Sequence, residues 1–241
     1  METNVSEEPR TDIPAGRRRE AGKDERRRRI ITAARELIRE THTVGLPMRE
    51  LARRAGVSLA TPYNLFGSKG AIVLAVMQDV RDYRQRFFSR PFADPVARIF
   101  DAVDLAVEYY LADPDFYQIL WREIFAASGD VRTAIYNPQR EQFWLGLIED
   151  AVAAGAISPA IDPDFLLHQL DHQFRSVMLD WVSGDLPPDA LAPTIWLGYA
   201  LMLLGAATPA WRGPLEIRVT QSQERMKIAG VQSAARSVLP A

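Results

Sequence analysis

Apolar residues recur at three- and four-residue spacing along most of this 241-residue chain, and no stretch of useful length alternates between apolar and polar residues. The first pattern places side chains on one face of an α-helix, whereas strict alternation is typical of a half-buried strand. Prolines and glycines divide the chain into segments of helical length. The sequence therefore predicts an all-α protein.

The predicted helices follow from these breaks. A first helix begins at Asp24 and ends before Gly45 and Pro47. Further helices are expected at about 47–55, 58–66, 69–88, 94–112, 115–128, 131–154, 163–184 and 189–207. Residues 214–236 are compatible with a last helix or a loose tail. Residues 1–23 carry many charges and no apolar face, so they are expected to form a disordered basic arm.

The charge of the chain is divided unevenly. Residues 1–70 hold 15 Lys or Arg and 10 Asp or Glu, whereas the remainder holds 14 and 21. A basic first third on an acidic body suggests a head that binds a polyanion. The chain has no cysteine, which excludes disulfides, thiolate metal sites and cysteine nucleophiles and fits a cytoplasmic location. We expect a domain at 24–70, linked by the helix 69–88 to a second domain at 71–241.

The segment from Met48 to Lys69 reads MRELARRAGVSLATPYNLFGSK and predicts a helix-turn-helix. Two short helices cross at a steep angle only where their contact residues are small and the turn tolerates a positive φ. Ala52 and Ala55 supply the small contacts and Gly56 the turn. Ser58 is expected to cap the second of the two helices.

The second helix of this pair exposes a surface almost without charge, which suits a helix that enters a DNA major groove. Its residues are Leu59, Ala60, Thr61, Tyr63 and Asn64. Asn64 can pair with adenine, and Leu59 or Ala60 can touch a thymine methyl group. Thr61 and Tyr63 suit phosphate oxygens, and Lys69 suits a phosphate at the start of the next helix.

These residues resemble the TetR-type transcriptional regulators. The resemblance covers about residues 26–80 and depends on A-x-x-A-G-V-S at Ala52–Ser58 and T-x-Y-x-x-F-x-S-K at Thr61–Lys69. It implies a dimeric, all-α protein with an N-terminal helix-turn-helix domain and a larger C-terminal domain for ligand binding and dimerisation. By position it implies DNA contacts at Arg49, Ser58, Leu59, Ala60, Thr61, Tyr63, Asn64 and Lys69.

Arginines precede the first helix at 17–19 and 26–29. Cations near a helix N-terminus oppose its macrodipole, so a counter-charge is expected. DNA phosphates or a minor groove would supply it. The alternative is that Asp24 and Glu25 balance the dipole and the arginines are merely solvated. Both interpretations stay open.

No residue from Ala190 to Ala210 is charged. Pro193 and Pro209 confine the helix there to about 15 residues, or ~22 Å, which is short of a ~30 Å hydrocarbon core. We therefore expect burial against a second subunit rather than in a membrane. Gly198 and Gly205 share one face and permit close helix approach, and the preceding helix would complete the dimer interface.

Aromatic residues are dense in the middle helices, where they form a core or line an apolar ligand pocket. Tyr109, Trp121, Trp144 and His172 are the expected pocket residues. His168, Asp171 and His172 place two histidines one helical turn apart, but no third strong metal ligand is evident, so neither a metal nor a cofactor is expected.

Together these observations predict a dimeric repressor, not an enzyme, that leaves a palindromic operator in double-stranded DNA when a small molecule binds. One alternative is an enzyme with a DNA-targeting head that uses His168, Asp171 and His172. Another is an architectural DNA-binding protein without an effector.

Overall fold

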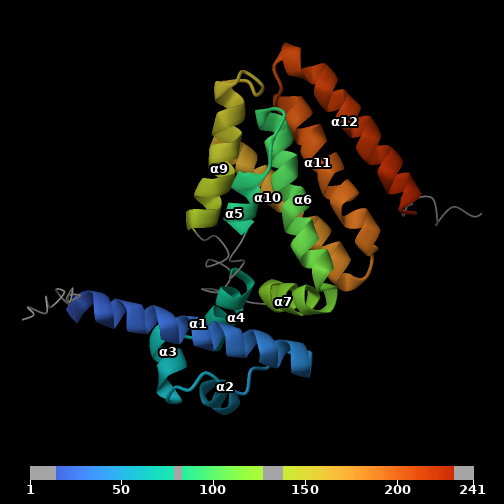
Figure 1. Ribbon diagram of the computed structural model, residues 1–241. Coiled ribbons are helices and arrows are strands. Elements are labelled where there is room, and N and C mark those ends of the chain that lie inside the picture. Colours follow the sequence, from blue (N-terminus) through green and yellow to red (C-terminus); the bar gives the residue numbers. More distant parts are fainter. Residues whose placement is uncertain (1–14, 79–82, 127–137, 231–241) are drawn as a thin grey trace, which may run out of the picture.

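The computed structural model describes residues 15–78, 83–126 and 138–230 (Figure 1). Within these ranges the chain is helical apart from its connections and an isolated antiparallel bridge between Ile157 and Ala207. The helices are α1 (Ala15–Thr41), α2 (Met48–Arg54), α3 (Ala60–Phe66), α4 (Lys69–Gln78), α5 (Tyr83–Ser89), α6 (Pro95–Ala112), α7 (Pro114–Ala126), α9 (Pro138–Ala153), α10 (Pro163–Ser183), the 3₁₀-turn η1 (Pro188–Ala190), α11 (Leu191–Ala206) and α12 (Pro209–Ile228). The predicted all-α class is confirmed.

The N-terminal helices pack around a core of their own. In Figure 1, α1 lies across α2 and α3, and the C-terminal helices stand on its other side. The buried core residues are Ile30, Ala33, Ala34, Leu37, Ile38, Leu46, Leu51, Ala55, Ile72, Val73, Val76, Phe116 and Leu120. Burial of each large aliphatic side chain stabilises the domain by about 1.5–3 kcal/mol. Since Ile72, Val73 and Val76 belong to this core, the domain extends past the boundary at residue 70 that the sequence suggested.

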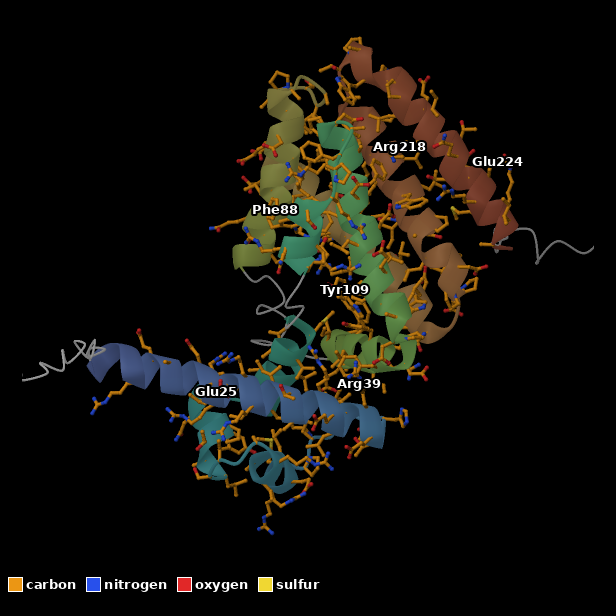
Figure 2. The ribbon with its side chains drawn as sticks, viewed as in Figure 1. Glu25, Arg39, Phe88, Tyr109, Arg218 and Glu224 are labelled. Atoms are coloured by element: carbon orange, nitrogen blue, oxygen red, sulfur yellow. The ribbon has the colours of Figure 1, made fainter. Side chains whose placement is uncertain are left out.

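Helix α7 joins the two domains. Its Phe116 and Leu120 lie in the N-terminal core, whereas Trp121 and Ile124 lie in the C-terminal core. The Arg39 guanidinium of α1 also bonds the carboxylate of Asp113, just before α7, with Nε 2.8 Å from Oδ2 (Figure 2). The sequence assigned this helix to the C-terminal domain alone, because periodicity does not say which core a helix face will enter.

The prediction of a disordered arm at residues 1–23 is wrong over part of this range. Helix α1 begins at Ala15, so residues 15–23 are helical, while residues 1–14 lie outside the described ranges. Alanine, arginine, lysine and glutamate favour helix, and extending an existing helix costs far less than nucleating one. The packed part of α1 from Ile30 onward provides that nucleus.

The helix predicted at 69–88 corresponds to α4 and α5, and residues 79–82 between them lie outside the described ranges. The segments predicted at 94–112, 163–184 and 189–207 match α6, α10 and α11 to within two residues, and the described part of the segment predicted at 115–128 is α7, with residues 127 and 128 outside the described ranges. For the segment predicted at 131–154, the described part is α9.

Local signals explain the sharp ends of α6 and α10. Asp94 and Asp162 accept hydrogen bonds from main-chain N–H groups in the first turns, at 2.7 and 2.9 Å. Proline follows each aspartate at the first helical position, where its missing N–H costs nothing. Helix α10 ends at Gly184 with φ of +86°, a conformation that glycine adopts without strain.

Helix α12 resolves the ambiguous C-terminal segment. The helix begins at Pro209, earlier than the expected 214, and continues through Pro214 to Ile228. It packs along α11 (Figure 1), and its Leu215 and Ser222 are buried. Residues 231–236 of the predicted helix lie outside the described ranges.

Helix α11 carries no charge and is buried at seven positions, among them Ile195, Tyr199 and Leu203. By length and composition alone, Pro188–Ala206 could cross a membrane, but a core helix passes the same test and 44% of that stretch is buried inside the protein. Gly198 faces Gln173 of α10, whose side-chain atoms lie 2.3–2.7 Å from where a Cβ would stand. The close approach expected at Gly198 is therefore made within one chain.

Candidate nucleic-acid interface

The turn between α2 and α3 has the geometry that the sequence predicts. Gly56 adopts a φ of +62°, and the Val57 N–H reaches back to the Ala52 carbonyl at 3.0 Å. Ala52 and Ala55 are buried, at 4% and 2% exposure, so no bulky side chain separates α3 from its neighbours. Small buried residues and a glycine turn are the features that a helix-turn-helix requires here.

Helix α3 presents an uncharged surface to solvent. Leu59 and Tyr63 are 47% and 44% exposed, and Ala60 and Asn64 are also exposed. Pro62 is buried on the opposite side. The five residues expected to face DNA thus share the outer side of α3, with Thr61 half-buried at its edge.

Ser58 does not cap α3 in the way the sequence suggested. The residue before the helix is Leu59, and no side chain caps the first turn. Instead the Ser58 and Thr61 hydroxyl oxygens lie 2.8 Å apart and share a hydrogen bond, while the Ser58 carbonyl accepts the Thr61 N–H at 3.0 Å. Two hydroxyls therefore lie side by side at the exposed start of α3, where a phosphate oxygen could accept from either.

The start of α4 lies directly after α3. Gly67 ends α3 with a φ of +82°, and its N–H bonds the Tyr63 carbonyl at 2.7 Å. The Ser68 hydroxyl accepts the Ala71 N–H at 3.1 Å, which occupies one of the free N–H groups expected beside Lys69. Lys69 is half-buried in the first turn of α4.

Most of the charged side chains of α2 form ion pairs with one another or with α1. Glu50 bonds both Arg53 and Arg54, with closest N–O distances of 2.6 and 2.8 Å, and Arg54 also forms a two-pronged pair with Glu40 of α1 at 2.6 and 2.7 Å. Hydrogen bonds from Arg53 and Arg54 lower the pKa of the Glu50 carboxyl to about 2. Arg49, the remaining arginine of α2, is exposed.

Arg27 of α1 holds the end of α3, a role that sequence reasoning missed. Its Nη1 donates to the Leu65 carbonyl at 2.6 Å, and its guanidinium lies 4.3 Å from the centre of the Phe66 ring. A cation at the C-terminal end of a helix interacts favourably with the helix dipole. The run of arginines at 26–29 drew attention to this segment, but which of the four turns inward depends on the helical register.

Three of the four expected pocket residues, Tyr109, Trp121 and Trp144, belong to the C-terminal core or pack against it. Trp121 is buried against Phe125 and Phe174, with ring centres 5.5 and 6.0 Å away. Tyr109 is half-buried near Tyr83, and its hydroxyl is buried without a hydrogen-bond partner. Trp144 is half-buried.

His172 is exposed on α10, with its ring centre 4.3 Å from that of His168, so the structure does not bring it to the buried aromatic residues. Asp171 pairs with Arg175 at 3.1 Å and Arg140 at 3.5 Å. Among the described residues, no group of three or more His, Asp or Glu side chains is placed to hold a metal ion.

The second helix of the helix-turn-helix is exposed and uncharged, and the motif is joined to a larger helical domain. This is the architecture of helix-turn-helix regulators. Residues 30–76 match the model of the bacterial regulatory proteins of the tetR family. The regulator EthR of Mycolicibacterium smegmatis is 28% identical over 158 residues, which cover 61% of this chain and 65% of EthR. The matched region thus spans slightly less than two thirds of that relative.

Solved structures share the fold. A TetR transcriptional regulator from Rhodococcus sp. RHA1 aligns with a TM-score of 0.62 and 23% identity over 78% of this chain and 100% of its own. Full-length TylP, a TetR regulator from Streptomyces fradiae, aligns with a TM-score of 0.56 and 17% identity over 92% and 95%. The N-terminal segment 30–76 thus matches the tetR family, and the chain as a whole shares the fold of these solved regulators.

Proposed function

We propose that this protein is a dimeric repressor that binds a palindromic operator through α2 and α3 and leaves it when a small molecule binds the C-terminal domain. The observation that carries this proposal is the uncharged outer surface of α3, held at a fixed tilt by Gly56 and the small residues behind it. Charged residues usually dominate an exposed helix, whereas amide and apolar side chains are those that read base edges.

The DNA contacts divide into two groups. Asn64, Leu59 and Ala60 meet base edges, with Asn64 paired to an adenine. Phosphate contacts set the register without carrying sequence information. They come from Arg49, Ser58, Thr61, Tyr63 and Lys69.

The dimer forms through α10 and α11. Large apolar side chains remain exposed on these helices in the single chain, namely Phe165 at 72%, Leu179 at 47% and Leu201 at 50%. Nothing lies within 4 Å of the Cβ position at Gly205, so a partner helix has room to approach there. Two recognition helices related by a twofold axis then read half-sites one or more turns of DNA apart, at roughly 34–36 Å per turn.

The small molecule binds among the aromatic residues of the C-terminal domain, near Tyr109, Trp121 and Trp144. The unpartnered Tyr109 hydroxyl provides a polar group of the kind that orients a ligand in an apolar site. Helix α7 carries the signal, because one of its faces lies in each core. The coupling between ligand and DNA is expected to be about 1–3 kcal/mol.

The test is selection of bound DNA from a random library with the full-length protein. A palindrome among the selected sequences supports the proposal, and its occurrence upstream of neighbouring genes would suggest the ligand. If the folded protein shows no preference over scrambled competitor at moderate salt, the proposal is wrong.

The two alternatives predict different results. An architectural DNA-binding protein shows little sequence preference and no effector-dependent release in footprints at several salt concentrations. An enzyme that uses His168 and His172 loses its activity when both are changed to alanine. The exposure of these histidines and the ion pairs of Asp171 do not favour that second alternative. As a regulator of genes the protein acts in the cytoplasm.

A further inference from the structure

Helix α1 extends beyond the domain that it supports. Its packed part begins at Ile30, which is fully buried, whereas residues 15–29 precede the core. At 1.5 Å per residue this extension is about 22 Å long. In Figure 1 its first turns run past α3, away from the other helices. Arg19, Lys23 and Arg26 are exposed along it.

The extension carries its cations in a definite register. The buried stripe of α1 contains Ile30, Ala33 and Leu37, and continuing this stripe backward by steps of four, three and four residues gives Arg26, Lys23 and Arg19. The apolar stripe thus becomes a basic stripe where the core ends.

The carboxylates of the extension lie on the other sides of the helix. At 100° per residue, Asp24 and Glu25 fall at least 100° from Arg19, Lys23 and Arg26, and Glu20 lies beside the stripe, 60° from Lys23. Glu25, labelled in Figure 2, is paired with Arg28 instead. The basic stripe therefore has no carboxylate within it.

Two contacts show that this side of α1 faces the helix-turn-helix. On one flank of the stripe, Arg27 bonds the Leu65 carbonyl at the end of α3. On the other flank, Arg29 Nη1 lies 3.2 Å from the Cβ position of Gly56, in the turn between α2 and α3. Arg19, Lys23 and Arg26 lie between these two directions on the helical wheel, so they point to the same side of α1 as the recognition surface.

We propose that Arg19, Lys23 and Arg26 form a second DNA contact, on the phosphate backbone that flanks the half-site read by α3. This inference rests on the proposed function. The three cations span seven residues, or about 10 Å, which matches roughly three base pairs at 3.4 Å each. A polyanion is the complementary partner. It also offsets the repulsion between the helix dipole and the arginines at 17–19, since the first turn of α1 contains no acidic residue.

The experiment compares two full-length variants with equal charge change. The test variant carries Arg19→Gln, Lys23→Gln and Arg26→Gln, because glutamine keeps the helix propensity of lysine and arginine. The control variant carries Arg84→Gln, Arg212→Gln and Lys227→Gln, three exposed positions of the C-terminal domain. Circular dichroism confirms that both are folded. Affinity is measured over a range of salt on the selected palindrome, with and without ten base pairs of flanking DNA on each side.

The wild type and the control variant should bind the flanked duplex more tightly than the bare palindrome, and the test variant should not show that preference. The salt dependence, log K against log salt, should become less steep by about 0.9 for each phosphate that the test variant no longer neutralises. Restoring charge with Arg19→Lys and Arg26→Lys, in place of glutamine, should recover the preference for flanked DNA.

Equal preferences for flanked DNA and equal salt slopes in the test and control variants would overturn the inference while leaving the proposed function intact. If the wild type itself prefers no DNA sequence, the proposed function fails and the inference fails with it. The two failures are therefore distinguishable.

Discussion

The insertion of α7 into the N-terminal core predicts that a substitution in α7, far along the chain from the helix-turn-helix, loosens the DNA-binding domain. Leu120 is fully buried among residues of α1 and α4. Leu120→Ala removes three carbon atoms from this core and leaves a cavity, at a cost of about 2–5 kcal/mol. Leu105 of α6 is the matched control, because it is equally buried but lies only in the C-terminal core.

Native-state hydrogen exchange measures the effect by region. In Leu120→Ala, the α1 and α4 amides that exchange by opening of this core should exchange about 30-fold to several thousand-fold faster, the equivalent of 2–5 kcal/mol. In Leu105→Ala, the accelerated amides should be those of α6 and α11. The milder Leu120→Met, which should cost less than about 1.5 kcal/mol, serves if the alanine variant does not fold. Unchanged α1 and α4 exchange in a folded Leu120→Ala protein would refute the shared core.

Three further predictions concern the interface and the C-terminal core. Asn64→Ala should relax base preference at one position of the half-site by about 1–3 kcal/mol, whereas Lys69→Ala should weaken binding to all sequences alike. Competition assays with single-base operator variants separate the two effects. Equal losses on every sequence for Asn64→Ala would contradict its role. Gly56→Ala places a β-carbon at a φ of +62°, which should lower the free energy of unfolding by about 1–2 kcal/mol and weaken operator binding. Urea unfolding and operator affinity measure the two effects. If both were unchanged, the turn would not need glycine. Burial raises the pKa of the Asp104 carboxyl to about 6, above its unfolded value near 4, so its charge opposes folding increasingly as pH rises from 4 through 6. The stability gained by Asp104→Asn in urea unfolding should therefore be larger at pH 7 than at pH 4, and equal gains at both would argue against a buried carboxylate.

Local sequence signals were sufficient for the helix-turn-helix. Ala52, Ala55 and Gly56 define its crossing, and all three take the positions expected of them. The outer surface of α3 follows from the same register, because a helix of seven residues leaves little choice of face. Whether those residues meet DNA as proposed stays a prediction.

The conformation of residues 15–23 and the surroundings of Phe116 and His172 depend on tertiary packing, which the sequence pattern does not reveal. The charged composition of residues 15–23 suggested disorder, but these residues continue a helix that the core beyond Ile30 already stabilises. The predicted domain boundary at residue 70 places α7 in the C-terminal domain, yet Phe116 of α7 packs in the N-terminal core. His172 was expected to line the same pocket as Trp121, but the register of α10 turns the histidine to solvent.

The ion pairs of α2 also bear on how the protein treats DNA that lacks its operator. Arg53 and Arg54 are paired with Glu50, and Arg54 also with Glu40, so these carboxylates offset much of the positive charge of α2. We therefore expect the two glutamates to weaken non-specific binding to DNA, which depends on cationic side chains that neutralise phosphates. A variant with Glu40→Gln and Glu50→Gln should therefore bind its operator more tightly at low salt. It should also bind non-operator DNA more tightly, and would then locate its operator more slowly in a genome.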